Sequence, residues 1–77
     1  MMEVIEGWEG IVMHFIEQHW DLGEVFSRED LYQHEAYFAR MYPDNLHIRT
    51  KLRQVLRVLA QNGEIETVEQ TGYRRLH

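Results

Sequence analysis

Basic and amide side chains cluster in one short stretch of this chain, Asn45 to Arg57, which reads NLHIRTKLRQVLR. Four of the eight lysines and arginines of the protein lie in it, namely Arg49, Lys51, Arg53 and Arg57. A guanidinium group can bond two acceptors of guanine at once, and Gln, Asn and Thr side chains can bond other base edges. The chemistry that these residue types favour is the binding of nucleic acid.

The rest of the chain is acidic, so the charge is unevenly distributed. The formal net charge of -5 would by itself disfavour phosphate binding. Residues 1–45 carry ten acidic residues against Arg28 and Arg40, a net -8, whereas residues 46–77 carry six basic residues against three glutamates, a net +3. No Asp or Glu occurs from residue 46 to residue 63. An ordinary solvated face of so acidic a protein would include carboxylates, so we favour binding over mere solvation.

Length and composition limit the other function classes. A chain of 77 residues suits one domain, residues 1–77, with a small core and no room for an elaborate enzyme site. There is no cysteine that could bind a metal ion. His14 and His19 are five residues apart, so they do not share one face of a helix as two metal ligands at i and i+4 would. No apolar run approaches the roughly 18 residues of a membrane span. We expect a cytoplasmic, non-enzymatic protein without catalytic residues, metal, cofactor, membrane contact or small-molecule substrate.

Apolar spacing predicts two helices in the acidic half. Apolar residues recur at intervals of three and four over residues 3–20, which indicates a first helix. Residues 24–26 then read as a short extended piece. Ser27 offers a hydroxyl cap with the carboxylate of Asp30 three residues later, which predicts a second helix ending near Met41.

The basic stretch belongs to a third predicted helix, from Leu46 to about Asn62, with Gly63 at its C-terminal cap. Its apolar residues form a continuous stripe made of Ile48, Leu52, Val55, Leu56 and Leu59. With this stripe in the core, the opposite face exposes His47, Thr50, Arg53, Gln54, Arg57 and Gln61, with Arg49 and Lys51 on its flanks.

After Gly63 the apolar period becomes two, which predicts strands at residues 64–68 and 73–76. Three helices followed by a two-stranded hairpin are the order of a winged helix-turn-helix, a mostly α fold with a small β-hairpin (α+β). In that fold the third helix enters the DNA major groove and the hairpin is the wing. The candidate DNA-binding residues are therefore Asn45, Leu46, His47, Arg49, Thr50, Lys51, Arg53, Gln54, Arg57 and the wing residues Arg74 and Arg75. Two alternatives stay open: Arg53 could pair with Glu35, and Arg49 could lie along the core edge.

Several segments carry a family resemblance: residues 42–48 (YPDNLHI), residues 51–56 (KLRQVL), Leu59, Gly63 and residues 72–76 (GYRRL). Together they resemble the C-terminal winged-helix domain of the Dam-replacing, DpnI-like restriction endonucleases. The resemblance covers about residues 25 to 77. Its most specific part is the block from Asn-x-His to Arg-Gln.

The resemblance implies a domain that binds double-stranded DNA and senses N6-methyladenine in a GATC context, while a separate nuclease domain or chain cuts. Its motif residues here are Asn45, His47, Lys51, Arg53 and Gln54. Arg57 stands where the family pattern has glutamine, so the base preference could differ. A methyl group on adenine favours a small apolar contact in the major groove, worth about 1 kcal/mol. The candidates for that contact are Leu46, Thr50 and the stem of Arg53.

The alternative function is a winged-helix module for protein interaction, or a transcriptional regulator without methylation sensing. Polarity at the start of the third helix separates these classes. DNA reading requires exposed polar residues there, namely Asn45, His47, Thr50 and Gln54. A protein interface would more often expose aromatic residues at that end.

Overall fold

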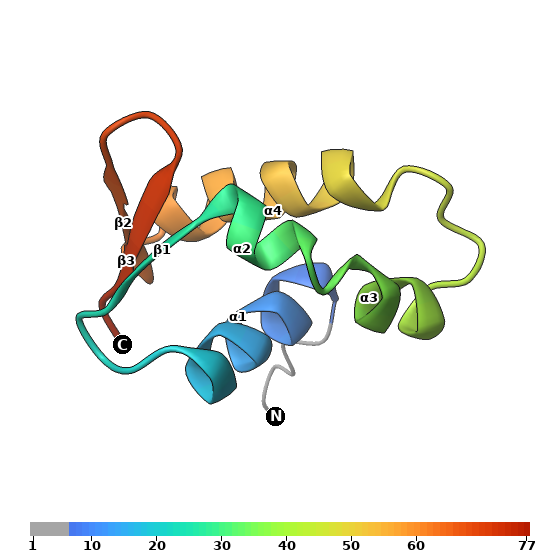
Figure 1. Cartoon of the computed structure of the whole chain (residues 1–77), viewed down its shortest axis with the longest axis horizontal. Helices are drawn as coiled ribbons and strands as arrows, with labels where there is room; N and C mark the ends of the chain where they lie inside the picture. Colours follow the sequence, from blue (N-terminus) through green and yellow to red (C-terminus); the bar gives the residue numbers. More distant parts are fainter. Residues whose placement is uncertain (1–6) are drawn as a thin grey trace, which may run out of the picture.

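The computed structural model describes residues 7–77 (Figure 1). Its elements are α1 (Trp8–His19), β1 (Val25–Ser27), α2 (Arg28–Tyr32), α3 (Glu35–Met41), α4 (Ile48–Gln61), β2 (Ile65–Val68) and β3 (Gly72–Arg75). In Figure 1, α4 lies across α1, and the small sheet stands at the C-terminal end of α4. The predicted winged helix-turn-helix, mostly helical with a small antiparallel sheet, is confirmed. None of the helices within residues 7–77 has the length and apolar character needed to cross a membrane.

The boundaries of the first helix differ from the prediction at both ends. Gly7 is the N-cap and Trp8 the first helical residue, while the predicted residues 3–6 lie outside the described part of the chain. Trp20 is extended, and its N–H group donates to the carbonyl of Ile16. Its ring stacks on that of Phe26 at 4.3 Å between centroids, so this contact packs the end of α1 against β1.

The prediction of a single second helix is wrong, because a turn separates α2 from α3. The cap at its start is confirmed, since Ser27 and Asp30 exchange both hydrogen bonds of a capping box, each 3.0 Å long. At the break, the N–H of His34 donates to the carbonyl of Leu31, and the His34 ring lies 4.9 Å from that of Phe15. No proline or glycine marks this site, so tertiary packing of the aromatic ring favours the turn over continued helix.

The sheet has three strands instead of the two predicted, because β1 pairs with β3. The strand order is β1-β3-β2, and all pairs are antiparallel. Phe26 is opposite Tyr73 and Ser27 is opposite Gly72, which joins the start of α2 to the wing. Residues 24–26 were predicted only as an extended piece. Two of them belong to β1, which is the additional strand of the sheet.

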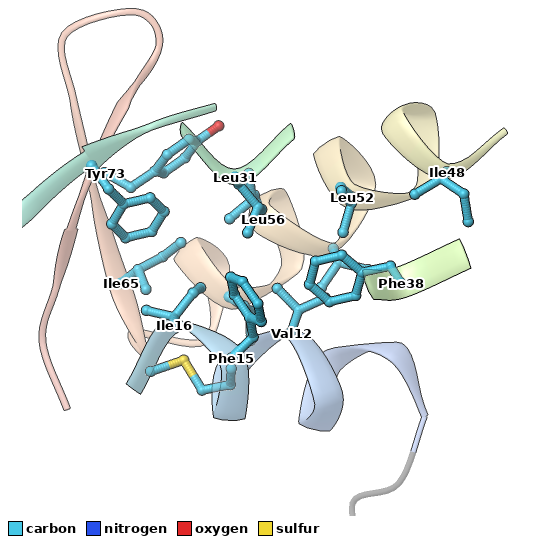
Figure 2. Packing of buried hydrophobic residues seen from close by; sticks show 14 residues of the cluster. Val12, Phe15, Ile16, Leu31, Phe38, Ile48, Leu52, Leu56, Ile65 and Tyr73 are labelled. Carbon is cyan, nitrogen blue, oxygen red and sulfur yellow. The ribbon is translucent and has the colours of Figure 1, made fainter. Parts of the chain in front are cut away.

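The core forms where α4 packs on α1. All five apolar residues predicted for the third helix are buried: Ile48, Leu52, Val55, Leu56 and Leu59. Figure 2 shows the side chains of α4 pointing into a cluster that includes Val12, Phe15, Ile16, Leu31 and Phe38. The burial of this stripe fixes which face of α4 meets solvent.

Two local features orient the ends of α4. Before the helix, the ring of Tyr42 stacks on that of Trp8 at 4.1 Å between centroids, which fastens the loop after α3 to α1. After the helix, Gly63 has φ of 80° and takes the predicted left-handed cap. Its N–H donates to Ala60, and the N–H of Glu64 donates to the carbonyl of Leu59, the two bonds of a Schellman motif.

The wing depends on a close backbone approach at Gly72, which pairs with Val68 at the hairpin end. A Cβ atom at Gly72 would lie 2.9 Å from the backbone oxygen of Val68. We expect Gly72→Ala to lower the free energy of unfolding by about 1–3 kcal/mol, because that backbone must shift. Urea denaturation measures the effect. The control is Thr71→Ala in the exposed turn, and equal losses in both variants would contradict this role for Gly72.

Candidate nucleic-acid interface

The solvent-facing side of α4 carries the polar residues that the sequence predicted. The exposed residues are His47, Thr50, Arg53, Gln54, Arg57 and Gln61, opposite the buried stripe. Arg49 is also exposed, and Lys51 is half-buried. This side therefore combines guanidinium, amide and hydroxyl groups on one helix, and none of its residues is acidic. It can offer hydrogen bonds to base edges and positive charge to phosphates.

The start of α4 differs from the prediction, because Leu46 precedes the helix. The N–H of His47 donates to the side-chain Oδ1 of Asn45 at 2.7 Å, which makes a tight turn before the first helical residue, Ile48. Leu46 is 84% exposed, the largest value among the exposed large apolar residues of the described chain. No side chain of residues 7–77 caps the first N–H groups of α4. Those groups can donate to an anion.

Arg49 contacts residues on both sides of the turn between α2 and α3. Its Nε donates to Oε1 of Glu35 at 3.0 Å, and its guanidinium lies 5.2 Å from the ring centre of Tyr32. Glu35, one possible partner for Arg53 from the sequence, binds Arg49 instead. Both partners are substantially exposed, at 59% and 41%, so the ion pair contributes little to stability.

The two wing arginines bond within the protein in different ways. Arg74 donates to Oε1 of Glu66 at 3.2 Å, in a cross-strand pair at the surface. Arg75 donates to the backbone oxygen of Trp20 at 2.9 Å and also to that of His77. Arg75 therefore ties the last strand to the end of α1, away from the polar side of α4. The carboxylate of Glu66 partly neutralises the positive charge of Arg74.

A hollow of about 570 Å³ lies beside the polar side of α4. Its lining residues are Arg28, Arg53, Arg57, Ala60, Gln61, Thr67 and Tyr73, which come from α2, α4 and the wing. Three of these residues are arginines and none is acidic. We call this feature the arginine hollow.

Three residues of the arginine hollow that can form hydrogen bonds through their side chains were not predicted from the sequence: Arg28, Thr67 and Tyr73. Arg28 lies in the acidic half of the sequence, where it looked isolated. Its backbone N–H donates to the carbonyl of Thr71 at 3.0 Å, and the preceding residue Ser27 pairs with Gly72. The pairing of β1 with β3 therefore brings Arg28 to the wing. No sequence signal indicated that pairing.

The hydroxyl of Tyr73 stays protonated at neutral pH and can donate a hydrogen bond. Burial raises the pKa of Tyr73, with Tyr32 acting in the same direction, whereas the positive charges of Arg28 and Arg53 act to lower it. The net effect is a raised pKa. Tyr73, Arg28 and Arg53 all line the arginine hollow.

Within residues 7–77, no group of three or more His, Asp or Glu is arranged to hold a metal ion.

The geometry agrees with a comparison of the sequence with known families. A model of the Dam-replacing HTH domain matches residues 5–75. In a helix-turn-helix the second helix of the motif is presented to the DNA major groove. The helix in that position here is α4, which follows α3, and the hairpin of β2 and β3 is the wing. The chain belongs to the family of Dam-replacing helix-turn-helix domains, which are DNA-binding domains.

Proposed function

We propose that the domain reads a specific site in double-stranded DNA and senses N6-methyladenine in a GATC-like sequence, on behalf of a restriction endonuclease. The observation that carries this proposal is the acid-free polar side of α4 in a domain of the Dam-replacing family. In the proposal, residues 1–77 act as a single binding domain in the cytoplasm. Strand cleavage requires a separate nuclease domain or chain.

Base reading is assigned to exposed residues in the first half of α4. Thr50, Arg53 and Gln54 are exposed there, with one turn of helix between the first and last. A bidentate contact between an arginine and guanine discriminates against the wrong base by about 1–3 kcal/mol. The acidic residues of the chain's first half repel the DNA backbone, so they favour approach by the α4 side.

Methyl recognition is assigned to the start of α4. Leu46 lies one residue before the N-cap His47 and is exposed, so it can contact DNA without any change in the core. The methyl group of N6-methyladenine projects into the major groove, where an apolar side chain gains from its burial. Exposed apolar surface beside polar base-reading residues is what such recognition requires.

The first test is fluorescence anisotropy with three short duplexes: fully methylated GATC, unmethylated GATC and a scrambled sequence. The wild type should prefer the methylated duplex, and contact with about five phosphates gives a log-log salt slope of about -4 to -5. Arg53→Ala should lose about 10- to 100-fold in affinity for the methylated duplex and lose the preference.

Arg40→Ala is the control, because it removes the same charge from α3, outside the polar side of α4 and the arginine hollow. A similar loss of preference in this variant would assign the effect to net charge. Equal wild-type binding to all three duplexes would disprove methylation sensing. The absence of binding to any duplex would favour a protein partner.

The second test concerns the methyl contact. Leu46→Ala should lower the preference for methylated over unmethylated GATC by about fivefold, the equivalent of about 1 kcal/mol, with little change on the unmethylated duplex. The matched control is Leu22→Ala, because Leu22 is also exposed but lies in the turn after α1. An unchanged methyl preference in Leu46→Ala would exclude Leu46 as the methyl contact.

The third test uses the ion pair of Arg49 with Glu35. Glu35→Gln keeps the side-chain shape and releases Arg49 to a phosphate, so DNA affinity should rise by up to about fivefold. Glu17→Gln on α1 removes the same negative charge and serves as the control. The gain should disappear in the double variant Glu35→Gln, Arg49→Gln. If both single variants gained equally, the effect would be one of net charge.

A further inference from the structure

We propose that the arginine hollow is the seat of one phosphate of the DNA backbone, held by Arg28, Arg57 and the hydroxyl of Tyr73. The inference deepens the proposed function and rests on it. It adds two residues outside α4, Arg28 on α2 and Tyr73 on β3, to the DNA contacts. It also gives the wing a direct role at the interface.

The arginine hollow holds positive charge that no carboxylate in its lining offsets. Arg28, Arg53 and Arg57 line one concave surface, and no lining residue is acidic. Like charges that converge repel each other, and an anion between them removes that cost. By contrast, Arg49 on α4 and Arg74 on β3 each pair with a glutamate. The arginine hollow is therefore suited to receive a negative charge from outside.

The position of Tyr73 also favours a phosphate at this place. Tyr73 is 8% exposed, and its ring packs near that of Phe26, with 5.8 Å between centroids. Figure 2 shows the hydroxyl at the edge of this cluster, directed away from the apolar side chains. A protonated phenol held in place by the core donates a hydrogen bond to a phosphate oxygen without losing side-chain freedom.

The shape of the arginine hollow and its place beside α4 suit a DNA strand. It spans from α4 to the wing residue Thr67, so it borders the side of α4 assigned to base reading. A volume of about 570 Å³ is far larger than one phosphate group, which leaves room for the neighbouring sugars of a strand. Arg53 lies on the border and can reach a base from there. A duplex with its major groove on α4 can therefore place its backbone here.

A phosphate contact positions DNA without reading its sequence. The test therefore compares the loss of affinity among duplexes of different sequence and methylation. Arg28→Gln should weaken binding to methylated, unmethylated and scrambled duplexes by the same factor, about 5- to 10-fold, and should reduce the salt slope by about one. Tyr73→Phe should weaken all three by a few-fold. Arg28→Lys should restore the slope, because it restores the charge. Arg40→Gln is the control, and a thermal melt of each variant checks its fold.

The outcomes separate this inference from the proposed function. If the wild type binds the duplexes but folded Arg28→Gln has an unchanged salt slope, the phosphate assignment is wrong and the proposed function stands. If Arg28→Gln changes only the methylated complex, Arg28 reads bases and the assignment also fails. If the wild type binds no duplex, both fail. Displacement of DNA by micromolar inorganic phosphate at constant ionic strength would identify a free-anion site and overturn the assignment to the DNA backbone.

Discussion

The packing of the apolar stripe of α4 on α1 is the contact on which the rest of the structure depends. Leu52 and Leu56 are fully buried against the cluster that contains Val12 and Ile16. Because a helix turns by about 100° per residue, burial of this stripe leaves only one orientation for the polar residues. The same contact therefore supplies hydrophobic stability and selects which side of α4 faces solvent.

Charge on the surface of the domain is arranged at two levels. Over the whole chain the acidic residues gather in the first half, and this gives the molecule a polarity that can orient it in the field of DNA. At short range, Glu35 and Glu66 neutralise Arg49 and Arg74, while the arginine hollow contains no carboxylate. Ion pairs therefore separate Arg49 and Arg74, which have a glutamate partner, from the arginines of the hollow, whose lining has no carboxylate. The sequence alone does not reveal this difference.

The parts of the fold that could be predicted are those encoded locally. The stripe of α4, the left-handed cap at Gly63 and the capping box at Ser27 each depend on residues within a few positions of one another. The break before α3 depends on the packing of His34 against Phe15, which is a tertiary contact and leaves no local signal. The three residues of β1 are likewise too few for an alternating pattern to indicate a partner strand.

In the candidate site, too, local features could be predicted and those that depend on tertiary contacts could not. The exposed polar residues of α4 were predictable because helical periodicity determines them. The partner of Glu35 was not, because Arg49 and Arg53 lie one turn apart on nearly the same side of the helix and differ mainly in position along its axis. Arg28 was missed because only the pairing of β1 with β3 brings it near the wing.

That pairing also determines how the wing can move. With β1 on one side and β2 on the other, β3 is a central strand, and the hairpin is anchored to the segment between α1 and α2. A hairpin bonded only to itself could swing as a separate arm and would lose that freedom on binding. A wing built into a three-stranded sheet has its position fixed relative to α4 in advance, so less conformational entropy is lost when the complex forms.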